Sequence, residues 1–151
     1  MNRIKIQMPT HFSFSTTINV RITDLNYGGH VGNDSFLSLI HEARQQYLRS
    51  YGYEELAIAG TGLIMADVAI EFKKELNYGD VVKISVTAEG FDKFGFDLFY
   101  KMELSGGVLA GNAKTGMLCY NYAAKKLVAV PTEVLDRLKN QNASPGGTTG
   151  L

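Results

Sequence analysis

Residues 24–33 read Asp24-Leu25-Asn26-Tyr27-Gly28-Gly29-His30-Val31-Gly32-Asn33, and this stretch decides how the chain folds. It is a polar, glycine-rich turn between a segment that alternates like a strand and one long segment with helical spacing. A turn in that place puts its polar groups at the N-terminus of the helix, where unpaired backbone N–H groups point at an anion. We therefore expect any chemistry of this protein to take place here.

The segments on either side of the turn have different periods. From Phe12 to Ile22 an apolar side chain recurs at every second position, which is typical of a strand with one buried face. After the turn, apolar residues recur at helical spacing over roughly four to five turns. Asn33 or Asp34 is the candidate N-cap of this helix, and Gly52 is its candidate end. Because apolar residues cover much of the helix surface, we expect other elements to surround it on most sides.

Four further segments read as strands separated by short turns. They span residues 63–72, 81–88, 94–104 and 108–122, and a short helix is expected from Pro131. Short connections between consecutive strands favour an antiparallel meander. The order of strand, helix and four strands predicts an α+β fold, in which a curved antiparallel sheet wraps around one long central helix.

Length and composition indicate one domain. A chain of 151 residues with 45% hydrophobic and 20% charged residues is long enough for a single full core. We expect residues 1–140 to form that domain. Residues 141–151 have no apolar period and are expected to form a flexible C-terminal tail.

Several classes of function are disfavoured. Fifteen basic and fifteen acidic residues cancel, so the chain lacks the strong positive charge of a nucleic-acid-binding protein. Cys119 is the single cysteine, and His11, His30 and His41 share no ligand spacing with acids, so we expect no metal and no cofactor. No apolar run reaches the length of a membrane span or forms a leader, so we expect a cytoplasmic protein without membrane contact.

The turn and the long helix also carry motifs that match a known family. The matching residues are Asp24, His30, Val31, Asn33, Leu37, Glu42, Ala43 and Arg44. With the element order, they resemble the hotdog-fold thioesterases of the 4-hydroxybenzoyl-CoA and acyl-CoA type. The resemblance implies a hotdog fold and an enzyme that hydrolyses an acyl or aromatic acyl thioester to a free acid and CoA. It also implies a homodimer or homotetramer, in which the sheets of two protomers join edge to edge and the sites form at the interface.

Position 26 departs from the family pattern. The family's catalytic carboxylate falls on Asn26, and an amide can act neither as a nucleophile of that kind nor as a base. One consequence is that His30 or an acid elsewhere activates water. A second possibility is a hotdog protein that binds acyl thioesters without hydrolysing them. A third is a hydratase or dehydratase that uses His30 with an acid.

Four residues are candidates for catalysis. His30 suits proton transfer at neutral pH. Asn26 is a candidate to hold water or the thioester oxygen, or only to cap the turn. Asp24 is a candidate to orient His30 or to act as the displaced base, or else to accept N–H bonds from its loop. Asp67 interrupts an otherwise apolar strand and is the reserve general base, unless it has a structural role on the opposite face of the sheet.

Five residues are candidates for substrate binding. The backbone N–H groups of Asn33 and Asp34 would polarise the thioester carbonyl with help from the helix dipole, as the resemblance also implies. Gly28 and Gly29 let the backbone approach the substrate closely, or simply form the turn. Glu42, on the helix, either faces a partner's pocket or pairs within its own chain. The length of the acyl group and the choice between CoA and a carrier protein stay open.

Overall fold

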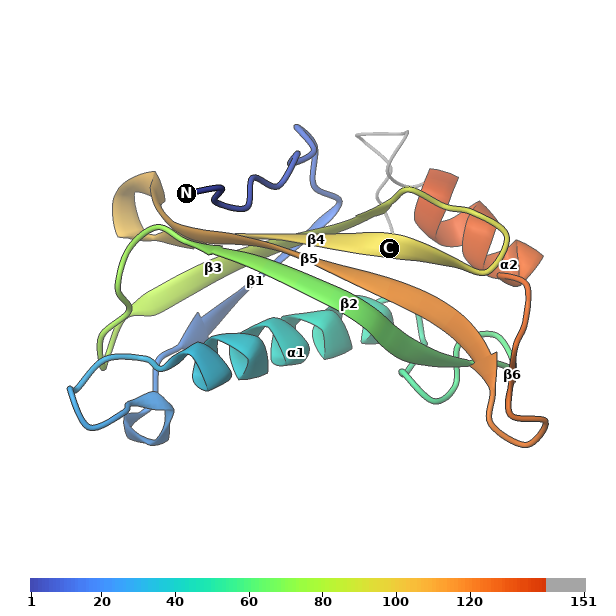
Figure 1. Ribbon diagram of the computed structural model, residues 1–151, viewed down its shortest axis with the longest axis horizontal. Helices are drawn as coiled ribbons and strands as arrows, with labels where there is room; N and C mark the ends of the chain where they lie inside the picture. Colours follow the sequence, from blue (N-terminus) through green and yellow to red (C-terminus); the bar gives the residue numbers. More distant parts are fainter. Residues whose placement is uncertain (141–151) are drawn as a thin grey trace.

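The computed structural model describes residues 1–140, and these form an α+β fold as predicted (Figure 1). The elements are β1 (Phe14–Asn19), α1 (Asn33–Arg49), β2 (Gly62–Phe72), β3 (Val81–Glu89), β4 (Gly95–Leu104), β5 (Val108–Asn121), β6 (Lys126–Leu127) and α2 (Thr132–Val134). A 3₁₀ turn at Ile22–Asp24 follows β1, and a second one at Ser105–Gly107 joins β4 to β5. A π-helical turn at Leu135–Lys139 continues α2. The tail expected at residues 141–151 lies outside the described residues.

The sheet is antiparallel throughout, but it is not a simple meander. Its strand order is β1-β3-β4-β5-β2, and β6 pairs with β5. The expected meander holds for β3, β4 and β5, whereas it is wrong for β2, which pairs with β5 and forms one edge of the sheet. Loop 73–80 carries the chain from β2 past the start of α1 to β3 (Figure 1). Turn residues indicate where a chain bends, but they do not indicate how far it travels before it pairs again.

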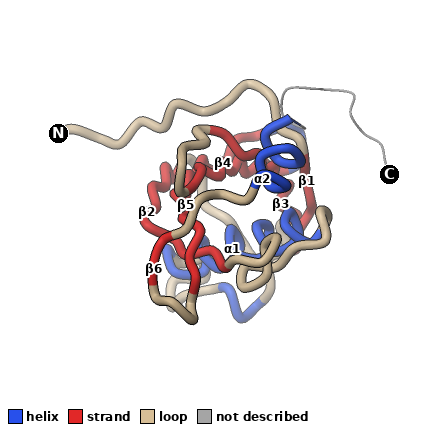
Figure 2. Tube along the Cα trace, turned by 90° about the vertical axis from the view of Figure 1, so that its right-hand side faces the viewer, coloured by secondary structure: helices blue, strands red, loops and turns tan. Residues whose placement is uncertain are grey.

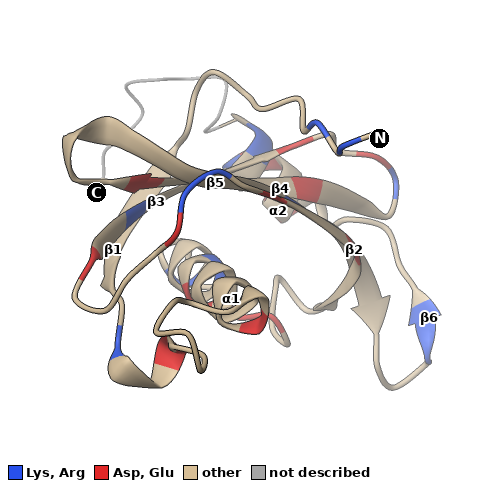
Figure 3. Cartoon of the chain, turned by 60° about the vertical axis from the view of Figure 1, so that its left-hand side comes forward, with Lys and Arg blue, Asp and Glu red and all other residues tan. Residues whose placement is uncertain are grey.

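α1 lies against the concave face of the curved sheet (Figures 1 and 3). Its buried residues are Phe36, Leu39, Ile40, Ala43, Arg44, Tyr47 and Leu48. They recur every three or four positions and so form one face of the helix. Leu37, Ser38, His41 and Glu42 on the other side are exposed. The expectation that neighbours surround the helix on most sides is therefore wrong for the single chain.

The ends of α1 also differ in detail from the expectation. Gly32 is the N-cap, not Asn33 or Asp34, and it contributes no side-chain hydrogen bond. Asp34 lies in the first turn instead, where a carboxylate interacts favourably with the helix dipole. The helix ends at Arg49, shortly before Gly52, whose φ is 80°.

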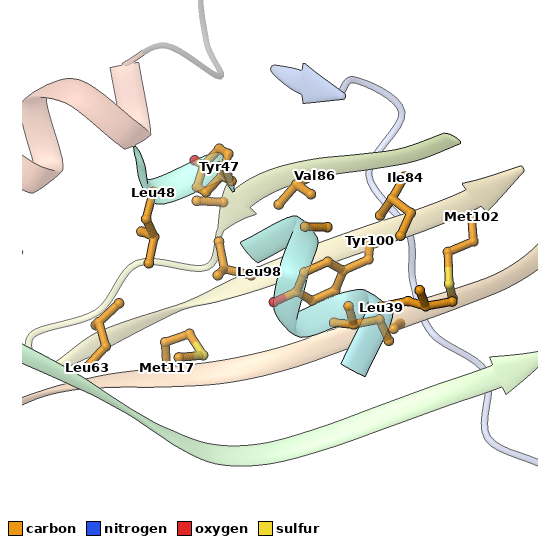
Figure 4. Close-up of a cluster of buried hydrophobic side chains, with 14 of the residues drawn as sticks. Leu39, Tyr47, Leu48, Leu63, Ile84, Val86, Leu98, Tyr100, Met102 and Met117 are labelled. Carbon is orange, nitrogen blue, oxygen red and sulfur yellow. The ribbon is translucent and has the colours of Figure 1, made fainter. Parts of the chain in front are cut away.

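The core between helix and sheet is apolar, but a chain of polar contacts runs through it. Figure 4 shows side chains of α1 packed against those of β3, β4 and β5. Within this core Arg44 Nη1 donates to the hydroxyl of Tyr100 at 3.2 Å, and that hydroxyl lies 2.7 Å from Thr115 Oγ1. Arg44 Nε also donates to Glu55 Oε1 at 3.4 Å. A buried polar group that loses its partner costs about 1–3 kcal/mol, so these bonds favour one position of α1 on the sheet.

The opposite face of the sheet carries the two ends of the described chain. The N-terminal segment and α2 both lie on the side away from α1 (Figure 2). Ile6 N–H donates to Glu71 Oε1 at 3.1 Å, which ties the N-terminal segment to β2. No helix among residues 1–140 is long and apolar enough to cross a membrane.

Candidate functional site

The turn is held in shape mainly by Asn26. Its backbone N–H donates to the carbonyl of His30 at 2.8 Å, and its carbonyl accepts from Gly29 N–H at 3.1 Å. Its side-chain Oδ1 accepts from Gly28 N–H at 2.9 Å and from His30 N–H at 3.4 Å. Gly29 has a φ of 78°, a conformation that favours glycine. The Asn26 carbonyl oxygen therefore caps the turn, as one of its two interpretations expected, and its Nδ2–H₂ group remains as a donor.

The turn leads directly into the N-terminus of α1. The first backbone N–H groups of the helix lie before its first i→i−4 hydrogen bond. The first such bond runs from Phe36 N–H to the carbonyl of Gly32 at 3.0 Å. A Cβ on Gly32 would lie 2.7 Å from Asp34 Oδ1, so the exposed Asp34 side chain would have to move to accommodate it. The same Cβ position is 3.8 Å from Asn26 Nδ2. The amide donor of Asn26 and the positive end of α1 therefore lie side by side, an arrangement suited to a developing oxyanion.

His30 lies in the same turn and contacts a distant loop. Its Nδ1 is 3.3 Å from Glu75 Oε2 and 3.4 Å from Asn77 Oδ1. Its side chain is 45% exposed, so the ring remains accessible to water and substrate. The turn thus brings together an imidazole, an amide donor and a helix N-terminus.

Asp24 does not contact His30. It is buried, and its carboxylate accepts from the backbone N–H of Arg21 at 2.8 Å and from the Arg21 guanidinium Nη2 at 3.2 Å. The hydrogen bond to this carboxylate raises the pKa of the Arg21 guanidinium. Asp24 therefore has the loop-binding arrangement that was one of its expected roles, and it stabilises the 3₁₀ turn before the site.

Asp67 and Glu42 lie away from the turn. Asp67 pairs in register with Gly116, next to Thr115, which is buried on the α1 side, so Asp67 projects from the opposite face of the sheet. Its carboxylate accepts from Lys114 Nζ at 2.8 Å, and this bond lowers the pKa of Asp67. Glu42 is exposed about 13 Å along α1 from Asn33 and accepts from Gln46 Nε2 at 2.7 Å. The structure does not bring either carboxylate to the turn.

Comparison with known proteins gives the family. The sequence pattern of the thioesterase-like superfamily matches residues 20–138. The chain belongs to this superfamily. A candidate esterase from Aquifex aeolicus is 29% identical over 126 residues, which cover 80% of this chain and 94% of the relative. The 1,4-dihydroxy-2-naphthoyl-CoA hydrolase of Thermosynechococcus vestitus is 26% identical over 124 residues, covering 80% and 85%.

Solved structures of other proteins share the fold. A hypothetical protein from Staphylococcus aureus, determined in complex with CoA, superposes with a TM-score of 0.79 at 16% identity and covers 97% of this chain and 94% of its own. The long helix and the curled antiparallel sheet match those of hotdog thioesterases, as the sequence motifs predicted. One of the distant relatives named above is thus a hydrolase of an acyl-CoA thioester.

Sequence reasoning missed two residues that contact His30 in the candidate site. Glu75 and Asn77 come from loop 73–80 and reach His30 across more than forty positions. The sequence marks residues 77–80 as a turn, but no local period indicates which part of the chain that turn approaches. Among residues 1–140, no three His, Cys, Asp or Glu side chains group closely enough to hold a metal ion.

A basic groove borders the same loop. It has a volume of about 510 Å³ and is lined by Arg3, Ile4, Lys5 and residues 70–73. Lys73 pairs with Glu71 at 3.2 Å, and the backbone bond from Ile6 lowers the pKa of that carboxyl. Figure 3 shows basic residues on the N-terminal segment and on the loop after β2. The groove combines three cationic side chains and apolar groups with the single carboxylate of Glu71, and the cations suit an anionic ligand.

Apolar side chains are exposed between α1 and the β2 edge. Leu37 is 38% exposed, Val68 40% and Phe72 51%. The Phe72 ring packs edge-to-face on that of Phe36, with the ring centroids 5.0 Å apart. This apolar surface begins one turn of helix after Asn33 and so adjoins the site.

Proposed function

We propose that this protein hydrolyses an acyl-CoA thioester to the free acid and CoA. The observation that carries the proposal is that one turn carries the half-exposed imidazole of His30 and leads directly into the N-terminus of α1. Thioester hydrolysis needs a base for water and donors for the oxyanion, and this turn supplies both. Membership of the thioesterase-like superfamily supports the same reaction class.

The proposed mechanism assigns one task to each group. The thioester carbonyl oxygen accepts hydrogen bonds from the backbone N–H groups of Asn33 and Asp34 and from Asn26 Nδ2. His30 Nε2 takes a proton from water while the water oxygen attacks the carbonyl carbon. The tetrahedral intermediate then breaks its C–S bond, and the thiolate of CoA takes the proton back from the imidazolium. Removing a positioned general base typically lowers a rate by about 10²–10⁴-fold.

The surroundings of the turn support an apolar acyl group and a CoA handle. The exposed apolar surface of Leu37, Val68 and Phe72 adjoins the oxyanion donors and would contact the acyl part. The basic groove at Arg3, Lys5 and Lys73 would receive the phosphates. A relative that acts on 1,4-dihydroxy-2-naphthoyl-CoA makes aromatic acyl groups part of the proposal.

The proposal includes a homodimer, alone or as half of a homotetramer. β2 is a long edge strand with free backbone groups along its outer side, and such an edge favours pairing with a second copy. Met65 and Val68 add exposed apolar side chains to that edge. Pairing there would bring a second protomer next to the apolar surface beside α1.

The direct test measures release of free thiol from short, long and aromatic acyl-CoA thioesters. We expect turnover with at least one of them, a loss of about 10²–10⁴-fold in kcat in His30→Gln, and higher activity in Asn26→Asp. His11→Gln is the matched control, because His11 is an exposed histidine outside the site. Wild-type kcat in His30→Gln would contradict the assignment of the base.

A second candidate function is binding of acyl thioesters without hydrolysis. It is favoured by one observation, that Asn26 Oδ1 is occupied by backbone N–H groups in place of the family's free carboxylate. No thiol release from the whole panel, with micromolar binding retained, would establish this function. Addition of water to an enoyl-CoA without thiol release would instead establish a hydratase.

A further inference from the structure

Loop 73–80 is tied to the catalytic turn through its backbone. Val31 N–H donates to the carbonyl of Leu76 at 3.1 Å, and His30 and Asn77 form an antiparallel β-bridge. Leu76 is 1% exposed and anchors the loop in the core. The approach of this loop to His30 therefore does not depend on the long side chains at its surface.

The two side chains that meet His30 from this loop fix where its proton lies. Nδ1 faces Glu75 Oε2 at 3.3 Å and Asn77 Oδ1 at 3.4 Å. Both oxygens are hydrogen-bond acceptors, so this arrangement calls for the hydrogen on Nδ1. Asn77 Oδ1 is the hydrogen-bond partner of Nδ1, and the carboxylate of Glu75, whose side chain is 69% exposed, lies within ion-pair distance of the same nitrogen. Neutral His30 is then the Nδ1–H tautomer, with a free lone pair on Nε2.

We propose that Glu75 is the positioning residue of the site, which supplies through His30 the carboxylate that Asn26 lacks. This inference rests on the proposed hydrolysis. Glu75 holds the imidazole with Nε2 available to water, and its charge stabilises the imidazolium that forms when Nε2 takes the proton. The proton returns from Nε2 to the leaving thiolate, so Glu75 keeps its own ionisation state throughout.

The other residues near the His30 ring are not suited to position it through a charge. Among residues 1–140, Glu75 is the charged side chain that the structure records in contact with the His30 ring. Asn77 and Asn26, which also contact His30, are neutral. Asp24 is bound to Arg21, and Asp67 projects from the other face of the sheet.

The first experiment compares Glu75→Ala, Glu75→Gln and Glu75→Asp with the wild-type protein in the thiol-release assay. We expect kcat to fall at least tenfold in Glu75→Ala, with KM unchanged, because Glu75 acts through the base and not on the substrate. Glu75→Gln keeps a hydrogen-bond acceptor but loses the charge, so its kcat should lie between those of the wild type and Glu75→Ala. Glu75→Asp should restore part of kcat. Glu54→Gln, which removes a carboxylate from an exposed position, is the matched control and should behave as wild type.

Two further readouts separate positioning from a merely structural role. In a His30→Gln background, Glu75→Ala should cause no further loss of kcat, because the group that it positions is absent. Nitrogen-15 NMR of the His30 ring at alkaline pH should show Nδ1–H in the wild type and a larger fraction of Nε2–H in Glu75→Ala.

The outcomes distinguish this inference from the proposed function. An active protein whose kcat and ring tautomer do not change in Glu75→Ala would overturn the role of Glu75 and leave the hydrolysis standing. A further loss of kcat in the His30→Gln background would also overturn it. A protein that releases no thiol from any thioester would overturn the hydrolysis and the catalytic part of the inference, while the NMR measurement still decides whether Glu75 sets the tautomer.

Discussion

Asn26 and His30 have different contacts within one turn. The side-chain oxygen of Asn26 binds the backbone N–H groups of Gly28 and His30, which shapes the turn. The ring of His30 faces away from those bonds toward loop 73–80. The Asn26 amide oxygen thus stabilises the turn, and because an amide cannot act as a base, the proposed hydrolysis assigns that role to the neighbouring imidazole.

Gly29 is the residue whose replacement should strain the turn most directly. At a φ of 78°, a side chain costs about 1 kcal/mol. We expect Gly29→Ala to lower the free energy of unfolding by about that amount in urea titrations, and to lower kcat because His30 shifts. Gly28→Ala is the matched control, because its Cβ would meet its neighbours at an ordinary 3.5 Å. Equal losses in both variants would contradict this explanation.

Asp67 should affect stability and not catalysis. Its bond to Lys114 lowers the pKa of the folded carboxyl, so its stabilisation is present above the unfolded pKa of about 4 and is lost as pH falls through the folded value. The side chain is 63% exposed, so we expect Asp67→Asn to cost only about 0.2–1 kcal/mol at pH 7. Urea titrations of both proteins should converge below about pH 3. A large loss of kcat in Asp67→Asn would contradict this prediction and indicate that Asp67 acts in catalysis.

At the level of elements, β2 has an exposed edge and a bulge that decide which side chains face α1. Met65 pairs with Met117 and Asp67 with Gly116, so one residue of β2 has no partner between them. The bulge turns Asp67 outward and leaves Met65 and Val68 on the α1 side. The exposed apolar surface of this edge follows from that shift.

The edge of β2 should carry the dimer contact. We expect light scattering to detect a dimer of the wild-type protein. A lysine at position 68 would place a charge in the apolar surface, so Val68→Lys should weaken that dimer. Val108→Lys is the matched control, because Val108 is 44% exposed outside this edge. Thiol release should fall with the dimer if the sites need both protomers. A dimer unaffected by Val68→Lys but broken by Val108→Lys would place the interface elsewhere.

At the level of the whole molecule, the two faces of the sheet have different tasks. The concave face holds α1 and the apolar surface next to the turn, whereas the N-terminal segment and α2 cover parts of the opposite face (Figures 1 and 2). The basic groove forms where the N-terminal segment meets the end of β2. Loop 73–80 starts at this groove and reaches His30, so it links the proposed phosphate groove to the proposed base.

The basic groove should recognise the CoA handle and not the acyl group. We expect the double variant Arg3→Gln, Lys73→Gln to raise KM for an acyl-CoA about fivefold, corresponding to ~1 kcal/mol of lost phosphate binding. KM for the N-acetylcysteamine thioester of the same acid, which has no phosphates, should stay unchanged. Lys126→Gln, on the exposed strand β6, is the control for net charge. Equal increases in KM for both thioesters would show that the groove acts on the acyl part instead.

The sequence by itself determined the elements and the composition of the turn. Alternating and helical spacings are local properties, so they identified β1, α1 and the four strands β2 to β5 to within a few residues. The glycines, the amide and His30 are neighbours in the chain, and the turn therefore had to bring them together. The N-cap was misplaced, because Gly32 holds that position without a side-chain bond.

Only the tertiary structure decided the partners of these elements. The pairing of β2 with β5, which turns Asp67 outward, and the contact of Glu75 with His30 each join positions that lie about forty or more residues apart. They depend on the path of loop 73–80 and on one unpaired residue in β2, and neither leaves a periodic signal in the sequence. The physical reason is that hydrophobic spacing selects a buried face, whereas register and loop path select which side chains meet across the fold.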